Sequence, residues 1–245
     1  MGERAPPPPC RYKAIGGAGF QAGLGGAVLR ELHLSLGVDF EGFASPLNAF
    51  YGHAAHCSAF PDVDAPFGSR GSFARFRPTR GAYEVNPPFV AGVIDEAAER
   101  MLRLLAAAEA AAQPLAFAVV LPGWLDCEGY ASLAAAPYLR ASVLVAAADH
   151  GFVDGAAHVR ARSFRESPYD TRLFVLQTSA AAASHPFGAD AAARVRDALA
   201  GCTPTAEALA NVAASERVHR GGAARAKGKR PRWGNAKRRA AKKAR

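Results

Sequence analysis

The chain has 245 residues, half of them hydrophobic, so it can bury one substantial α/β domain but hardly two. It contains no apolar run long enough to span a bilayer, and its polar, proline-rich beginning does not resemble a signal peptide. We therefore expect an intracellular protein without a membrane partner, and its net charge of +9 is concentrated near its end.

The first residues carry the run Pro6–Pro9 and two glycine clusters, and we expect region 1–26 to be a disordered lead. The clusters Gly16–Gly19 and Gly23–Gly26 superficially resemble a dinucleotide-binding loop. No convincing strand precedes them, so we interpret them as linker. The predicted domain covers residues 27–216, and a basic, disordered tail covers residues 217–245.

Hydrophobic periodicity predicts alternating helices and strands after the lead. The predicted helices cover residues 27–36, 47–57, 90–112 and 189–199. The predicted strands cover residues 38–44, 115–121 and 172–178, with another ending at 83–85 and one near 142–148, and a loop covers 60–71. This alternation predicts an α/β fold with a mostly parallel central sheet and helices on both faces.

The stretch Asn86-Pro87-Pro88-Phe89 lies between a predicted strand and a predicted helix. The amino group of adenine is a poor nucleophile because its lone pair is delocalised into the ring. The Asn86 side-chain oxygen and the Pro87 carbonyl can accept hydrogen bonds from that group, and Phe89 can stack on the ring. Asn-Pro and Pro-Pro are also common in simple turns. The position at the carboxyl end of a parallel strand favours amine methylation.

Metal chemistry has weaker support. His53, His56 and Cys57 have the spacing of one helix face, but no fourth ligand lies nearby, and the four cysteines are widely separated. We therefore predict no metal site, and we interpret these three residues as parts of a helix surface or core.

The end of the chain is strongly basic. Residues 220–245 hold 12 Lys and Arg and no Asp or Glu, which leaves 18 basic and 21 acidic residues in the rest of the chain. Two basic clusters surround Pro231 and Trp233, a pattern typical of nuclear import signals and nucleic-acid contacts. We expect a nuclear protein with an import receptor as a partner, although a solvated terminus without a receptor has the same composition.

Several motifs occur in a specific order between Leu29 and Thr178. They are the segments Val38–Asn48, Cys57–Asp64, Phe67–Gly71, Glu84–Phe89 and Leu121–Trp124. In this order the chain resembles the phosphorylated-CTD-interacting factor family of cap-specific adenosine N6-methyltransferases. The resemblance implies a Rossmann-like fold that uses S-adenosylmethionine to methylate N6 of 2′-O-methyladenosine beside the 7-methylguanosine cap. It also implies that the partners are capped mRNA and the phosphorylated C-terminal domain of RNA polymerase II.

The resemblance also assigns residues to the two ligands. The residues implied for the cofactor are Ser45, Pro46, Asn48, Asp62, Phe67, Gly68 and Ser69. Those implied for the substrate are Arg70, Gly71, Trp124, Asp149 and His150, in addition to the catalytic segment Asn86–Phe89. From residue types alone, Ser45 can equally cap a helix, Asp62 can form a turn, and Trp124 can cover the core. Arg70 can face the donor carboxylate or a cap phosphate.

Two departures from the family pattern keep other functions open. Ala91 stands where the family has an acidic residue, and the segment Ala147–Gly151 has less of the aromatic and acidic character expected there. Only 28 residues precede the similar region, where family members carry a long helical region and a WW module. One alternative is therefore a weak or inactive adaptor that binds RNA or the polymerase tail. Another is the same chemistry on a different acceptor, such as adenine in DNA or glutamine in a protein.

Overall fold

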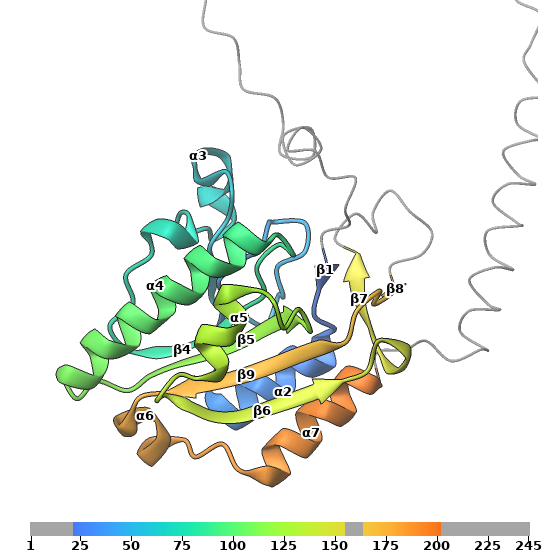
Figure 1. Cartoon of the computed structure of the whole chain (residues 1–245). Coiled ribbons are helices and arrows are strands. Elements are labelled where there is room, and N and C mark those ends of the chain that lie inside the picture. Colours follow the sequence, from blue (N-terminus) through green and yellow to red (C-terminus); the bar gives the residue numbers. More distant parts are fainter. Residues whose placement is uncertain (1–21, 155–163, 202–245) are drawn as a thin grey trace, which may run out of the picture. The chain divides into compact units, whose positions relative to one another are not determined.

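The computed structural model describes residues 22–154 and 164–201, which all belong to one compact unit. Six strands form the central sheet in the order β3-β2-β4-β5-β9-β6 (Figure 1). Neighbouring strands are parallel from β3 to β5, whereas β9 pairs antiparallel with both β5 and β6. The predicted α/β class and mostly parallel sheet are confirmed. The strands are β2 (Phe40–Glu41), β3 (Ala55–His56), β4 (Gly81–Val85), β5 (Leu115–Pro122), β6 (Leu139–Val145) and β9 (Thr171–Gln177).

Helices cover both faces of this sheet (Figure 1). Helices α2 (Gly26–Leu36) and α7 (Ala189–Ala200) pack on one face, and α4 (Ala91–Ala110) and α5 (Glu128–Ala134) pack on the other. Every residue of β5 is buried because its side chains alternate between the two cores. A strand that is buried on both faces has a continuous hydrophobic sequence, and this sequence is what predicted β5.

The two helices α4 and α5 pack very closely at Gly129. A side chain there would place its Cβ 2.9 Å from the Asp95 Cα and the Ile94 carbonyl oxygen, so only glycine fits. The Asp95 carboxylate accepts a hydrogen bond from the Gly129 N–H at 2.7 Å and so caps the start of α5. Helix α5 was missed from the sequence, since its seven residues give little periodicity.

A second, three-stranded antiparallel sheet joins distant parts of the chain in the order β1-β7-β8. Its strands are β1 (Ala22–Gly23), β7 (Gly151–Asp154) and β8 (Phe164–Glu166). The interpretation of Gly23–Gly26 as linker is wrong, because Gly23 pairs with Val153 and Gly26 begins α2. The remaining glycine cluster and the predicted boundary at residue 216 lie outside the described residues.

Two further predictions are wrong between β2 and β4. Residues 47–54 form turns rather than a helix, and the predicted strand at 38–44 contains only two strand residues. The predicted loop at 60–71 contains α3 (Pro61–Asp64) and a 3₁₀ helix, Ala65–Phe67. Other short elements are the 3₁₀ helices Phe73–Arg75 and Ala147–Asp149 and helix α6 (Ser179–Ser184).

The remaining predicted elements agree with the structure within a few residues. Helices α2, α4 and α7 and strands β4, β5 and β9 occur where periodicity placed them. Strand β6 begins and ends three residues earlier than predicted, and a 3₁₀ turn follows it. Within the described ranges, no helix combines the length and apolar character that crossing a membrane requires.

Candidate active site

The strand order reverses at β2, and we call the position between the carboxyl ends of β2 and β4 the crevice. From β2 the chain first forms β3 on one side and then crosses to form β4 on the other side of β2. At such a reversal the loops after the two flanking strands diverge, and ligands of open α/β sheets bind in the gap outside the carboxyl ends. In this chain the gap lies between the loop after β2 and the segment Asn86–Phe89 after β4.

The carboxyl ends of β2 and β4 are held in close contact. The Gly42 N–H donates to the Glu84 carbonyl oxygen at 2.7 Å, which extends the pairing of Glu41 with Glu84. A side chain at position 42 would lie 3.1 Å from that oxygen and 3.1 Å from the Phe73 ring. Gly42 therefore fixes the distance between the two loops. A longer, glycine-rich fingerprint does not follow β2 in the sequence.

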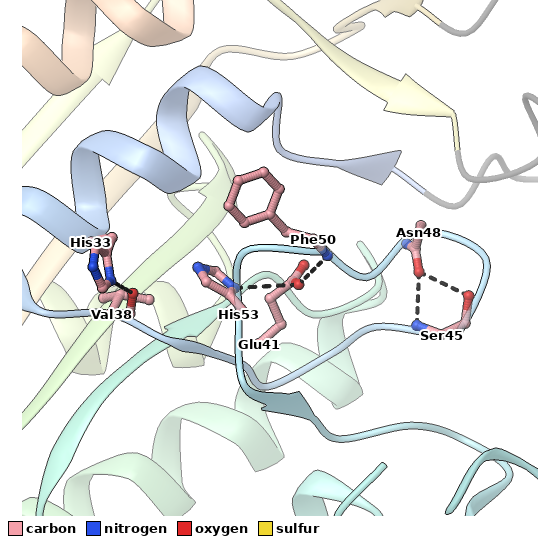
Figure 2. A network of polar contacts seen from close by, with 7 residues as sticks. All are labelled: His33, Val38, Glu41, Ser45, Asn48, Phe50 and His53. Atoms are coloured by element: carbon pink, nitrogen blue, oxygen red, sulfur yellow. Dashed lines mark hydrogen bonds and ion pairs between the residues drawn. The ribbon is translucent and has the colours of Figure 1, made fainter. Parts of the chain in front are cut away.

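The loop after β2 is closed by its own side chains, as Figure 2 shows. The Asn48 Oδ1 accepts from the Ser45 N–H at 2.7 Å and from the Ser45 hydroxyl at 2.8 Å. The Ser45 carbonyl accepts from the N–H groups of Asn48 and Ala49. Ser45 and Asn48 therefore shape the predicted donor loop through contacts with each other, and Pro46 lies between them.

Glu41 fastens the second half of this loop to the sheet. Its Oε1 accepts from the Phe50 N–H at 2.7 Å and lies 3.4 Å from the His53 Nδ1 (Figure 2). Glu41 is only 5% exposed. Because the backbone N–H of Phe50 is taken by a carboxylate nine residues earlier, a helix through residues 47–57 cannot form without breaking this bond.

Three buried titratable residues stand in register at the carboxyl ends of β3, β2 and β4: His56, Glu41 and Glu84. Burial raises the pKa of Glu84 well above its ordinary value, and the neighbouring Glu41 carboxylate raises it further. Burial lowers the pKa of His56, while Glu41 and Asp64 oppose that shift. Burial therefore favours the uncharged form of both side chains, the protonated carboxyl group of Glu84 and the neutral imidazole of His56.

The segment Gly68–Gly71 runs beside the end of β3. The backbone N–H of Arg70 donates to the His56 carbonyl oxygen at 2.8 Å, and the backbone N–H of Ser58 donates to the Gly71 carbonyl oxygen at 3.0 Å. Gly68 and Gly71 have φ angles of 95° and 97°, which other residues rarely adopt. These two glycines therefore let the segment turn back alongside the strand.

The side chains of this region divide into buried and exposed groups. The Ser69 hydroxyl is buried and lies 2.7 Å from the Ser58 hydroxyl, so it supports the loop from within. Phe67, Asp62 and Arg70 are exposed at the surface. Asp64 is fully buried close to His56, so it replaces Asp62 as the acidic residue inside this region.

The segment Asn86–Phe89 occupies the carboxyl end of β4, as predicted. Asn86 is 7% exposed and Pro87 is buried, whereas Pro88 reaches the surface. The Val90 N–H donates to the Pro88 carbonyl at 2.7 Å, and Ala91 then begins α4 as an exposed residue. The turn thus presents Asn86 inward and leaves the side chain of Phe89 half-buried at the crevice.

Aromatic rings gather around Phe89. Its ring centroid lies 5.8 Å from Phe152 and 6.3 Å from Trp124, both edge to face. Trp124 follows β5 and is half-buried, so it lies at the same edge of the sheet as Phe89, as predicted. A further ring, Tyr169, lies 5.3 Å from Trp124 and was not predicted.

Asp149 and His150 follow β6 at the same edge. His150 is 1% exposed, and both its ring nitrogens are engaged at 2.7 Å, Nδ1 with the Ala146 carbonyl and Nε2 with the Thr171 hydroxyl. Its ring also contacts Phe152. His150 therefore has no nitrogen to offer a substrate and instead supports the aromatic cluster, which corrects its predicted role. Asp149 is exposed in the 3₁₀ turn.

The described residues contain no group of three His, Cys, Asp or Glu side chains that could hold a metal ion. His53, His56 and Cys57 do not share a helix face, since His53 lies in a loop and His56 in β3. Burial raises the pKa of the Cys57 thiol to about 12, so this thiol is protonated and unreactive while it stays covered.

Sequence comparisons identify the family of the chain. Residues 9–155 match the family model described as the phosphorylated CTD interacting factor 1 WW domain. The chain belongs to this family. Two relatives, from Mus musculus and Homo sapiens, are each named mRNA (2′-O-methyladenosine-N(6)-)-methyltransferase. Each is 37% identical to the chain over 145 residues, which are 58% of the chain and 20% of the relative.

The chain thus corresponds to about a fifth of the length of these curated relatives. The family match includes all the residues predicted as catalytic, cofactor-binding or substrate-binding, from Ser45 to His150. It ends before β8 and β9, so the phosphorylated CTD interacting factor family model does not cover Tyr169.

Sequence reasoning missed two kinds of residue at the crevice. Glu41 and Glu84 lie inside the quoted motifs, and a carboxylate in the middle of a buried strand was a signal that could have drawn attention to them. Tyr169 gave no local signal because its position depends on β9 pairing with β5 over more than forty residues.

Proposed function

We propose that this chain is part of an S-adenosylmethionine-dependent methyltransferase that methylates N6 of 2′-O-methyladenosine beside the 7-methylguanosine cap of mRNA. One observation carries the proposal: Asn86-Pro87-Pro88-Phe89 stands at the carboxyl end of β4, one strand from the loop after β2, at the reversal of strand order. The names of the two relatives supply the acceptor. The strand order and the helices on both faces also support a Rossmann-like methyltransferase fold.

The residues after β2 and β3 fit a nucleoside with an amino-acid group. The His56 Nε2 is buried and makes no hydrogen bond among the described residues, while buried Asp64 lies close to it. Such groups suit ribose hydroxyls or an amino group. We infer that the backbone of the Ser45–Asn48 loop and the segment Gly68–Ser69 complete the donor site. When bound, S-adenosylmethionine supplies a methyl group that its sulfonium makes electrophilic.

On the acceptor side the chain supplies positioning and hydrogen bonds. The Asn86 side-chain oxygen and the Pro87 carbonyl accept from the two hydrogens of the adenine amino group and orient its nitrogen. Phe89 stacks on the base, and Trp124 and Phe152 hold the Phe89 ring in place. No strong base is required, because the proton can leave to water after the new bond forms.

The partners follow as further parts of this proposal. The family description names the phosphorylated polymerase tail, and we infer that the complete protein works beside it in the nucleus. An import receptor rests only on the basic composition of residues 220–245, which lie outside the described residues. We infer that Arg70, which is exposed beside the end of β3 and next to Gly71, faces a phosphate or a carboxylate.

The proposal is tested by incubating the protein with labelled S-adenosylmethionine and four acceptors: capped RNA, uncapped RNA, DNA and a glutamine-containing peptide. We expect N6-methyladenosine from capped RNA alone, detected by nucleoside mass spectrometry. Transfer to another acceptor would keep the chemistry and replace the substrate. Heat from donor binding in calorimetry without any transfer would identify a donor-binding adaptor, and no heat at all would reject the cofactor.

A further inference from the structure

A row of aromatic rings leads from the candidate acceptor site to the protein surface. Phe89 contacts Trp124 with ring centroids 6.3 Å apart, and Trp124 contacts Tyr169 at 5.3 Å. Exposure increases outward, since Phe89 and Trp124 are half-buried and Tyr169 is 44% exposed. The row therefore ends on a ring that a ligand at the crevice can reach.

The turn that carries Tyr169 is held rigidly. The buried Ser167 hydroxyl donates to the Tyr169 carbonyl at 2.6 Å. The Asp170 carbonyl accepts from the Gly123 N–H at 2.7 Å, and the Asp170 carboxylate accepts from the Ala147 N–H at 2.9 Å. The turn is thus bonded to the loop after β5 and to the turn after β6. A ring fixed in this way loses little further freedom when a ligand stacks on it.

Apolar side chains border this row at the same edge of the sheet. Val90 is 56% exposed next to Phe89, and Leu125 is 74% exposed next to Trp124. Large apolar side chains that gather on a surface beside a crevice mark a contact site more often than scattered ones do. Under the proposed function the ligand that reaches Asn86 is an adenine within a nucleic acid, so we take a nucleic acid as the occupant of this border.

We propose that Tyr169 is a stacking site for the nucleobase that neighbours the acceptor adenine in the bound strand. This inference rests on the proposed function, because the acceptor defines which base is the neighbour. Every nucleobase has a π face, and single-stranded nucleic acids bind through successive bases that stack on aromatic side chains. The neighbour is either the 7-methylguanine of the cap or the base that follows the adenosine.

The experiment compares Tyr169→Ala, Tyr169→Phe and the exposed control Leu34→Ala. The Leu34 side chain is 77% exposed on α2, outside the aromatic row and both proposed ligand sites. The three substrates are a capped 2′-O-methyladenosine with no following nucleotide, the same cap with a short oligonucleotide, and the uncapped oligonucleotide. Thermal unfolding of each variant checks the fold.

Tyr169→Ala should raise KM by about 5- to 150-fold, the range expected for one lost stacking contact, with kcat unchanged. Tyr169→Phe and Leu34→Ala should match the wild type. If the neighbour is the cap guanine, the increase appears with the capped mononucleotide. If it is the following base, the increase requires the longer capped substrate.

Equal KM values for Tyr169→Ala and the wild type on every substrate would overturn the inference and point to a polypeptide on this surface. The methyl-transfer proposal would remain intact. A Tyr169→Phe variant as weak as Tyr169→Ala would also overturn it, since the hydroxyl would then be the contact. If no substrate is methylated, quenching of Trp124 fluorescence in a Trp233→Phe background still measures binding. Binding that depends on Tyr169 would support the stacking site without the reaction, and binding that does not would reject it.

Discussion

The two sides of the crevice are built in different ways. On the donor side, after β2 and β3, polar side chains bond to one another: Ser45 to Asn48, Ser58 to Ser69, and Glu41 to the Phe50 backbone. On the acceptor side, after β4 and β5, aromatic rings contact edge to face and remain partly exposed. The donor side therefore offers a fixed backbone, and the acceptor side offers side chains that a ligand can touch.

Because of this difference, residues that stand out in the sequence have different roles on the two sides. In the donor loop the residues that stand out in the sequence, Ser45 and Asn48, hold the loop in shape. In the proposed acceptor loop the conspicuous residues are Asn86, which is buried at the end of β4, and Phe89, which is half-buried against Trp124 and Phe152, and we propose that both contact the acceptor. Substitutions on the two sides should consequently damage different steps, donor binding on one side and methyl transfer on the other.

The largest effect is expected for Asn86→Ala. Removal of the side-chain acceptor should lower kcat about 100- to 1000-fold, as the loss of one positioned hydrogen bond in a transition state does. The affinity for S-adenosylmethionine, measured by calorimetry, should stay within a few-fold because donor contacts lie on the other side. Turnover of a capped RNA at the wild-type rate would show that Asn86 has no part in transfer.

How much of this site the sequence predicted depends on how local each feature is. The loop Asn86–Phe89 was placed correctly because β4 before it and α4 after it are both visible in the local hydrophobic pattern. The loop after β2 was expected to lead into a helix at residues 47–57, and that helix was wrong. Alanines and leucines around residue 50 favour a helix, and the tertiary contact of Glu41 with the Phe50 N–H outweighs that preference.

Features that depend on distant pairing were not predictable. The Ser167–Asp170 turn reaches the crevice only because β9 runs antiparallel between β5 and β6. The strand pattern of residues 171–177 showed a buried strand but not its direction. His150 likewise is buried with its ring nitrogens bonded to Ala146 and Thr171, whereas the resemblance to the family implied substrate contact.

A smaller effect, on the opposite step, is expected for Asn48→Ala. The variant loses the two hydrogen bonds from Ser45 that close the donor loop, so the loop must be ordered when the donor binds. We expect the Kd for S-adenosylmethionine to rise about tenfold. At saturating donor, kcat should be close to that of the wild type. Leu34→Ala, at a 77% exposed position on α2, serves as the control.

A second variant at Asn48 tests directly whether the two sides of the crevice are built in different ways. If Ser45 and Asn48 only shape the backbone, an Asn48→Asp variant, which keeps the accepting oxygen, should bind the donor almost as well as the wild type. If Asn48 instead contacts the donor through its amide N–H, both variants should lose affinity equally, and the two sides of the crevice would be alike.

The smallest effect on activity, but a distinct one on stability, is expected for Glu84→Gln. Burial and the Glu41 carboxylate hold the pKa of Glu84 well above its ordinary value of 4.5, so the folded state keeps a proton that the unfolded state releases. The stability that Glu84 contributes is complete below pH 4.5 and is lost as the pH rises through its raised pKa.

Glutamine resembles the protonated carboxyl group in shape and cannot ionise. The unfolding free energy of Glu84→Gln should therefore fall less with rising pH than that of the wild type. It is measured by reversible denaturation from about pH 4 to about pH 9, which spans the ordinary and the raised pKa values of carboxyl groups. Glu99→Gln, at a position where the side chain is 67% exposed beside Arg103, should leave the wild-type slope unchanged. Parallel curves for Glu84→Gln and the wild type would mean that Glu84 is ionised in the folded state. The link between the two loops would then rest on the Gly42 N–H and Glu84 carbonyl alone, since the Glu84 side chain would add no proton-dependent contribution to it.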